Sequence, residues 1–108
     1  MPEIVLGDFE QVVLLALLRC GDEAYGVPIW RELEARTGRK ISIAAVYKTL
    51  ERLDVKGLVR SKVGEPTAER GGRAKRLYAV SPSGLRALRT SIGRLRRLTA
   101  GLDEVLGS

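Results

Sequence analysis

Residues 42–59 read SIAAVYKTLERLDVKGLV, and this stretch sets the architecture expected for the whole 108-residue chain. Ser42 is a favourable N-cap and Gly57 a favourable stop signal, so the stretch predicts a helix that runs to Lys56. One side of that helix is an apolar stripe of Val46, Leu50 and Leu53, with Ile43 and Tyr47 at its margin. The opposite side begins with small residues and continues with cations: Ala44, Ala45, Lys48 and Arg52. We therefore expect one buried side and one open side.

Two helices are expected before residue 42. Asp8, with Gln11 three residues later, has the spacing of a capping box and leads into an almost unbroken apolar run, which predicts a helix over residues 8–20. Because this helix is apolar nearly all round, we expect it to be buried on two sides, against its own domain and against something else. Tyr25-Gly26-Val27-Pro28 opens a second helix, which is expected to end near Gly38.

Two strand-forming runs follow the quoted stretch, Leu58–Val63 and Lys75–Val80. A polar loop joins them and carries the cationic sequence Arg70-Gly71-Gly72-Arg73. Both runs also have Lys or Arg at alternate positions. The pattern predicts a β-hairpin with a cationic tip.

A final helix is expected to begin at Ser81-Pro82-Ser83-Gly84. Apolar residues recur along it at spacings of three and four, interrupted at Thr99; they are Leu85, Leu88, Ile92, Leu95, Leu102 and Leu106. A helix that reaches Leu106 would be about 37 Å long at 1.5 Å per residue, longer than a small domain can cover. We therefore expect this apolar seam to meet a second copy of the chain.

Composition excludes several classes of protein. The chain has no His and one Cys, so it lacks the residues for a catalytic triad, an internal disulfide or a Cys-rich zinc site, and no catalytic residue, metal ligand or cofactor is expected. Its longest apolar run, Val12 to Leu18, is far shorter than the roughly 20 residues that span a bilayer, and no basic segment precedes it as in a secretory signal. We expect a cytoplasmic protein, nucleoid-associated when it is bound to DNA, with no membrane partner.

The net charge of +6 is unevenly distributed along the chain. Residues 1–57 carry 8 basic and 9 acidic side chains, a net charge of −1, whereas residues 58–108 carry 11 basic and 4 acidic ones, a net charge of +7. Such asymmetry favours a polyanionic partner, and nucleic acid fits better than a membrane surface because no helix combines Lys or Arg with exposed aromatic anchors.

The order of elements, three helices, a hairpin and a long helix, is that of a winged helix-turn-helix. We predict a mainly α fold with a small β-hairpin (α+β), divided into a DNA-binding domain over residues 1–80 and a dimerisation helix over 81–108 that forms one compact unit with the first helix. The third helix would enter the major groove of DNA, and the hairpin would lie on the backbone or in the adjacent minor groove.

Three motifs resemble the PadR-like transcriptional regulators. They are Tyr25-Gly26, then Val46-Tyr47-Lys48-Thr49-Leu50-Glu51-Arg52-Leu53 leading to Gly57-Leu58-Val59, and Gly72-Arg73-Ala74-Lys75-Arg76-Leu77-Tyr78 leading to Ser81-Pro82-Ser83-Gly84. The resemblance covers residues 6–106 and is to the short branch of the family, which has a single C-terminal helix. It implies a homodimeric bacterial DNA-binding regulator, usually a repressor, whose C-terminal and first helices form the dimer interface. The family's small-molecule effectors, where a member has one, bind near that interface, and the sequence identifies none.

The expected partners are a second copy of the chain and a double-stranded DNA operator with an inverted repeat. The expected DNA contacts are Ser42, Ala44, Ala45, Tyr47, Lys48 and Arg52 on the third helix, with Arg73 and Lys75 on the hairpin. Where the family usually has Gly followed by Thr or Ser, this chain has Ala44 and Ala45, so phosphate contacts there fall to Ser42, backbone N–H groups or Tyr47.

Some alternatives stay open at this point. Tyr47 is either a DNA contact or a core residue, and Trp30 is either a core or interface anchor or a ligand-stacking group. Cys20 is either a half-buried apolar residue or a redox-sensing thiol. A winged-helix module that binds RNA or another protein is the alternative function, since fold does not fix function. An enzyme is not expected.

Overall fold

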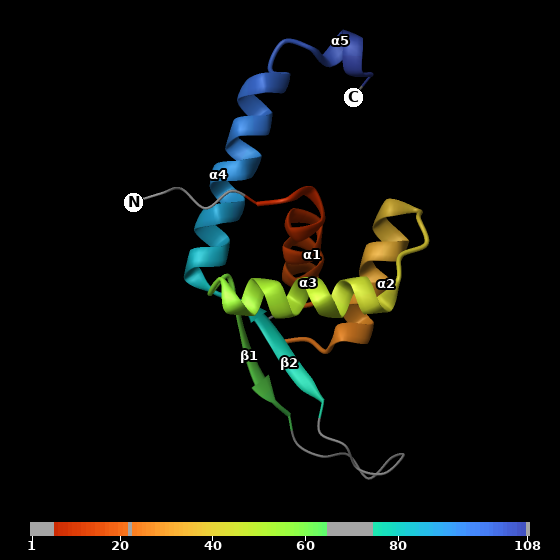
Figure 1. Ribbon diagram of the computed structural model, residues 1–108. Coiled ribbons are helices and arrows are strands. Elements are labelled where there is room, and N and C mark those ends of the chain that lie inside the picture. Colours follow the sequence, from red (N-terminus) through yellow and green to blue (C-terminus); the bar gives the residue numbers. More distant parts are fainter. Residues whose placement is uncertain (1–5, 22, 65–74, 108) are drawn as a thin grey trace.

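A computed structural model of the chain describes residues 6–21, 23–64 and 75–107 (Figure 1). The elements follow one another as α1 (Asp8–Arg19), α2 (Gly26–Thr37), α3 (Ile43–Val55), β1 (Val59–Val63), β2 (Arg76–Val80), α4 (Pro82–Thr99) and α5 (Asp103–Leu106). The predicted mainly α fold with one hairpin is confirmed. Arg73 and the rest of the expected cationic tip, residues 70–73, lie outside the described residues.

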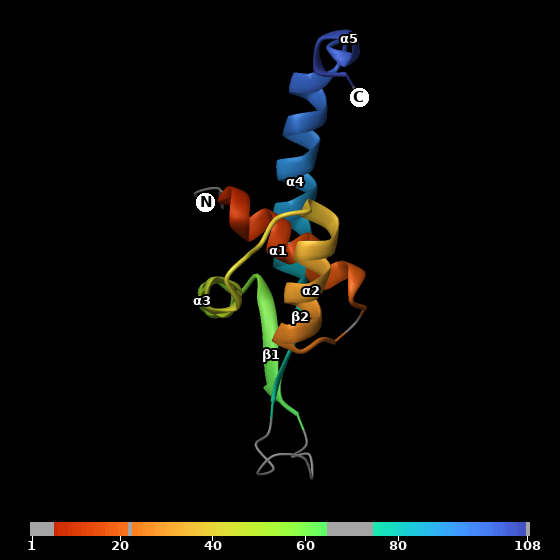
Figure 2. The ribbon, with the colours of Figure 1, turned by 90° about the vertical axis from the view of Figure 1, so that its right-hand side faces the viewer.

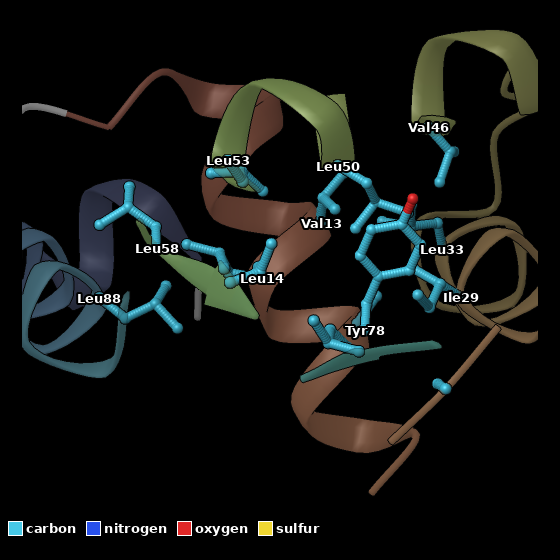
Figure 3. Packing of buried hydrophobic residues seen from close by; sticks show 14 of the residues in the cluster. Val13, Leu14, Ile29, Leu33, Val46, Leu50, Leu53, Leu58, Tyr78 and Leu88 are labelled. Carbon is cyan, nitrogen blue, oxygen red and sulfur yellow. The ribbon is translucent and has the colours of Figure 1, made fainter. Parts of the chain in front are cut away.

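The core lies where α1, α2 and α3 meet, and the start of α4 and the hairpin close it (Figure 3). All three residues of the predicted apolar stripe of α3 are fully buried: Val46, Leu50 and Leu53. They pack in one cluster with side chains from every neighbouring element, including Leu14, Ile29, Leu58, Tyr78 and Leu88. The rotation of α3 about its own axis is therefore set by burial.

The hairpin is antiparallel, with Val59 opposite Val80 and Val63 opposite Arg76. It is tied to the chain before α2 because Ala24 and Tyr78 exchange two backbone hydrogen bonds, of 3.0 and 2.8 Å. The hairpin (β1 and β2) thus extends from the helical body as a wing, and β2 is held between β1 and Ala24 (Figure 1).

The junction between the hairpin and α4 explains the Ser-Pro-Ser-Gly motif. Ser81 Oγ donates to the Gly57 carbonyl at 2.6 Å and accepts from the Gly84 N–H at 3.0 Å, so one hydroxyl caps α4 and holds the end of α3. A Cβ at Gly84 would lie 2.0 Å from the Leu58 carbonyl oxygen. Only glycine lets α4 approach the backbone this closely.

The start of α1 differs from the prediction. The N-cap is Gly7, which makes Glu10 the third helical residue, and the Gly7 N–H donates to Glu10 Oε1 at 2.9 Å. Gln11, expected to complete a capping box with Asp8, instead accepts a hydrogen bond from Ser91 Oγ of α4. The helix starts at Asp8, one residue earlier than a capping box of Asp8 and Gln11 requires, which shifts the capping position from Gln11 to Glu10.

The prediction of one continuous final helix is wrong. α4 has 18 residues, about 27 Å, and ends at Thr99, after which Gly101 adopts a left-handed conformation with φ of +80° and the four-residue α5 follows. A residue with positive φ cannot continue a right-handed helix, so the apolar spacing across Gly101 is not the spacing of one helix. The prediction that Leu88 meets a second copy is also wrong, because this residue is only 2% exposed and belongs to the chain's own core.

Glu10 makes a second contact that joins α1 to the end of α3. Lys56 Nζ donates to Glu10 Oε2 at 2.7 Å, and the Glu10 side chain is 6% exposed. Burial raises the pKa of the Glu10 carboxyl, but the hydrogen bonds from Lys56 and the Gly7 N–H, with the charges of Lys56 and Arg52, outweigh it and leave the pKa below its usual range.

We predict that Glu10→Gln lowers the free energy of unfolding at pH 7 by about 1 to 3 kcal/mol, because a charge-assisted buried pair is lost. A group whose pKa is depressed by folding stabilises the folded state above its unfolded pKa and ceases to do so as pH falls through its folded pKa. The difference between the two proteins should therefore shrink between about pH 5 and pH 3. Urea unfolding at one protein concentration measures the free energy of unfolding of both proteins at each pH.

Glu32→Gln is the matched control, because Glu32 pairs with Arg36 on an exposed helix surface at 2.8 Å. It should change the free energy of unfolding by only about 0.5 kcal/mol or less. A loss for Glu10→Gln that is equally large at pH 7 and pH 3 would contradict the ion-pair account.

Candidate nucleic-acid interface

The outward side of α3 is open to solvent along its whole length. Figure 2 looks down the axis of α3, which stands at the side of the molecule above the hairpin. Most of the expected contact residues of this helix are exposed, and Ala45 is half-buried: Ser42, Ala44, Tyr47, Lys48 and Arg52 are the exposed ones. The structure therefore brings these six predicted residues together on one surface.

Three contacts fix the beginning of α3. Ser42 Oγ accepts the Ala45 N–H at 3.3 Å, as the predicted N-cap requires. Before it, Trp30 Nε1 donates to the Ile41 carbonyl at 2.7 Å, and the Ile41 N–H donates to Glu34 Oε2 at 2.9 Å. Trp30 is therefore an anchor of the turn between α2 and α3, the first of its two predicted roles.

Tyr47 is neither a core residue nor a free side chain. It is 38% exposed, and one part of its ring lies against the first residue of α2. A Cβ built on Gly26 would come within 2.4 to 2.6 Å of three Tyr47 atoms, two ring carbons and the hydroxyl oxygen. Gly26 thus provides the space that the Tyr47 ring occupies, and the rest of the side chain is open to solvent.

The hairpin is braced against α3 by a chain of hydrogen bonds. Arg76 Nη1 donates to Ser61 Oγ at 2.9 Å, and Ser61 Oγ donates to Asp54 Oδ2 at 2.6 Å. On β1, Lys62 pairs with Glu23 at 2.6 Å. The positions of the hairpin and of α3 are therefore linked by polar contacts as well as by the core.

Lys75, the expected hairpin contact that the structure describes, is exposed at the open end of the hairpin. Its Nζ lies 5.6 Å from the centre of the Tyr25 ring, within the range of a cation–π interaction. This contact holds the ammonium group on the same end of the molecule as the start of α2.

The structure adds two residues that the prediction left out of the outward side. Glu51 and Val55 are both exposed on α3, and Val55 is 89% exposed. The same 100° rotation per residue places Glu51 between Ala44 and Tyr47, so the sequence already held the signal. The surface is therefore mixed in charge, and Glu51 can accept hydrogen bonds where Lys48 and Arg52 only donate.

Other kinds of site find little support in the described part of the chain. Cys20 is half-buried, and its burial, with the negative charge of Glu32, raises the pKa of its thiol, which favours the unreactive form. No group of three or more Cys, Asp or Glu residues within the described ranges is placed to hold a metal ion. No helix among the described residues is long and apolar enough to cross a membrane.

A helix whose buried stripe leaves a solvent-exposed face, preceded by a second helix and followed by a braced antiparallel hairpin, defines a winged helix-turn-helix protein. Residues 14–90 match the family described as transcriptional regulator PadR-like. The transcriptional regulator Rv3488 of Mycobacterium tuberculosis is 35% identical over 86 residues, which cover 80% of this chain and 73% of that protein. The chain belongs to the PadR-like family.

Solved structures agree with this assignment. A PadR family transcriptional regulator from Eggerthella lenta superposes with a TM-score of 0.67 and 26% identity, over 89% of this chain and 81% of that one. A PadR-like transcriptional regulator from Bacillus cereus superposes with a TM-score of 0.69 over 93% and 92% of the two chains, and at 18% identity it supports the fold alone. The family is one of transcriptional regulators, which are not enzymes.

We predict that Gly26→Ala displaces the Tyr47 ring and lowers the free energy of unfolding by about 1 to 3 kcal/mol, the usual effect of overpacking. In a Tyr47→Ala background the same substitution should have little effect, because the ring that it meets is gone. Thermal or urea unfolding of the four proteins completes the double-mutant cycle. Equal effects of Gly26→Ala in both backgrounds would show that Gly26 is needed for another reason.

Proposed function

We propose that the protein is a cytoplasmic homodimeric repressor that binds an operator containing an inverted repeat. Residues 1–80 bind DNA in this proposal, and residues 81–108 contribute the dimer contacts. α3 of each protomer enters the major groove, and each hairpin contacts the backbone or the adjacent minor groove. The observation that carries the proposal is the open side of α3.

That side has the shape and chemistry that a major groove about 12 Å wide admits. Ala44 and Ala45 are small, so the positive end of the helix can approach a phosphate without steric hindrance, beside the Ser42 hydroxyl. Lys48 lies one turn further in, where a side chain reaches guanine O6 and N7, and Glu51 can accept from the cytosine amino group. Arg52 follows one turn after Lys48, on the side of the DNA backbone.

Binding to RNA or to a protein surface is supported less well by the same side of α3. Sequence-specific RNA recognition uses exposed aromatic rings on which splayed bases stack. Tyr47 is the one aromatic residue of α3, and part of its ring is already covered by Gly26. The centre of a protein–protein interface is usually depleted in Lys and Glu, and this side of α3 carries Lys48 and Glu51 beside the exposed Val55.

Dimerisation is supported by apolar side chains that this chain leaves uncovered. Beyond Ile92, which packs on the core, the exposed ones are Leu95 (49%), Leu98 (73%), Leu102 (43%), Val105 (82%) and Leu106 (58%). Leu98 and Val105 extend the predicted set. Exposed apolar side chains in this number on a small protein favour an interaction site, and a two-fold dimer would suit an inverted repeat.

Base reading and backbone binding should separate in two variants. We predict that Lys48→Ala weakens operator binding by about 1 to 3 kcal/mol and relaxes the base preference at one position of each half-site. Lys75→Ala should weaken binding to all duplexes about equally. It should also reduce the slope of log affinity against log salt concentration by about one unit per chain. Fluorescence anisotropy over a salt series, with a selected operator and a scrambled duplex, measures both.

The control is wild-type protein, whose affinity should fall about 10³- to 10⁵-fold between 50 and 200 mM salt if six to ten phosphates are neutralised per dimer. If Lys48→Ala lowered the affinity for both duplexes equally and Lys75→Ala lowered only the affinity for the operator, the roles of helix and hairpin would be reversed. A flat salt response of the wild-type protein would contradict DNA binding itself.

Leu95→Glu should convert the dimer to monomers and lower the melting temperature, because a charge in the interface must be buried without a partner or the interface must open. Sedimentation velocity should show the wild type near twice the 11.8 kDa chain mass and the variant near that mass. Thr90→Glu, at an exposed polar position of the same helix, is the matched control and should stay dimeric. Unchanged mass for Leu95→Glu would show that this seam faces solvent.

A further inference from the structure

We infer that the outer side of α4 binds the phosphate backbone of a second DNA duplex while α3 and the hairpin hold the operator. The surface, here called the α4 arginine stripe, consists of Arg86, Arg89, Arg96 and Arg97. All four residues are exposed. The inference goes beyond the proposed operator binding, because it assigns a separate surface and a sequence-independent ligand to the same chain.

The four arginines lie on one side of α4. At 100° per residue they fall within an arc of about 100°, on the side away from Leu95. Ser83, Thr90 and Gly93 lie within or beside the same arc, which holds no large apolar side chain. In the proposed dimer the seam around Leu95 is covered, so the α4 arginine stripe stays open to solvent.

The positive charge of α4 is not balanced within the chain. The 18 residues of this helix include five Arg and no Asp or Glu. Arg89, Arg96 and Arg97 make no ion pair and no side-chain hydrogen bond with any described residue. Arg86 donates to the Ser83 hydroxyl at 3.1 Å, which is a neutral partner. A solvent-exposed side normally mixes both signs of charge, and cations three residues apart repel one another, so a bound polyanion would relieve this helix.

The helix dipole explains only part of this arrangement. Cations in the last turn of a helix are stabilised by its C-terminal carbonyl groups, and Arg96 and Arg97 lie there. Arg86 and Arg89 lie in the first half of α4, where the dipole gives a cation no stabilisation. Their presence on the same side as the other two is explained by an external row of anions along the whole helix.

The composition of the α4 arginine stripe fits a phosphate backbone better than other polyanions. The guanidinium group of Arg is planar and donates two hydrogen bonds to one phosphate, and Ser and Thr hydroxyls, such as that of Thr90, also donate to phosphates. α4 has no aromatic residue, which a membrane-surface helix or an RNA-binding surface would use. From Arg86 to Arg97 the helix rises about 16.5 Å, so the stripe can reach phosphates on both sides of a major groove about 12 Å wide.

The far end of the α4 arginine stripe lies away from the proposed operator-binding surface. α4 runs from the base of the hairpin past the helical body, and its second half stands at the opposite end of the molecule from the hairpin (Figures 1 and 2). A duplex on α3 and the hairpin would therefore leave Arg96 and Arg97 open to another duplex. The proposed dimer would present two such stripes and could hold two DNA segments together.

A bridging measurement tests the inference. The duplex that the protein selects from a random pool is fixed to beads and saturated with the protein, and a labelled scrambled duplex is then added at 50 mM salt. We expect the wild-type protein to capture this second duplex. Arg89→Ala combined with Arg96→Ala should reduce the capture at least about tenfold, because two phosphate contacts per chain are lost. The affinity of this variant for the selected duplex alone should stay within about threefold of the wild-type value.

Arg31→Ala combined with Arg39→Ala is the matched control, since it removes the same charge from exposed positions on α2 and in the turn after it. It should leave the capture within about twofold of the wild-type level. An equal loss of capture in both double variants, or no capture by the wild-type protein, would contradict the inference and leave the proposed operator binding unaffected.

Failure of the protein to select any duplex would contradict the proposed function instead. The α4 arginine stripe is then tested by fluorescence anisotropy of the scrambled duplex alone. The variant with Arg89→Ala and Arg96→Ala should bind this duplex at least about tenfold more weakly than the matched control. Equal binding by the two variants would contradict the inference in this case as well.

Two competitors identify the partner of the α4 arginine stripe. Poly-L-glutamate and vesicles of phosphatidylglycerol are compared with unlabelled scrambled duplex at the same concentration of negative charge. We expect each to displace the labelled duplex at least about fivefold less effectively than the unlabelled duplex, because a DNA duplex releases condensed counterions when it binds. Equal displacement by poly-L-glutamate would assign the stripe to an acidic protein, and equal displacement by the vesicles would assign it to a membrane surface. Either result would overturn the inference.

Discussion

The burial of one stripe of α3 is the constraint on which the remaining structure depends. Val46, Leu50 and Leu53 have no exposed surface, and burying such a side chain stabilises a fold by about 1.5 to 3 kcal/mol. Turning α3 about its axis would expose all three, so the helix has one rotation. The residues half a turn away, Ala44 and Lys48 among them, are thereby held toward solvent. The orientation of the open side of α3 is therefore a consequence of the core.

Polar and steric contacts then fix α3 along its length. At its start, Trp30 and the Ser42 cap hold the turn. In its second turn, Tyr47 fills the space above Gly26. At its end, Lys56 binds Glu10 of α1. The hairpin is braced on the same helix because Ser61 of β1 donates to Asp54, so the positions of α3 and the hairpin are linked.

Local signals in the sequence predicted the element bounds well, because caps and stop glycines act on their own neighbours. Ser42 and Gly38 mark the ends of helices in the structure as in the prediction. Periodic spacing failed where Gly101 interrupts it, since a backbone with positive φ overrides an apolar pattern. The contact of Glu10 with Lys56 joins residues 46 positions apart, and only the folded core brings them together. The contact of Tyr47 with Gly26 could likewise not be predicted from the sequence, because only the fold brings these residues together.

In the proposed complex, α3 offers its open side to DNA. Amide chemical-shift mapping by NMR, on adding the duplex that the protein selects from a random pool, tests this most directly. We expect the largest shifts at Ala44, Ala45 and Lys48, with a second group at the hairpin around Lys75. Shifts confined to other elements, with the amides of α3 unchanged, would contradict it.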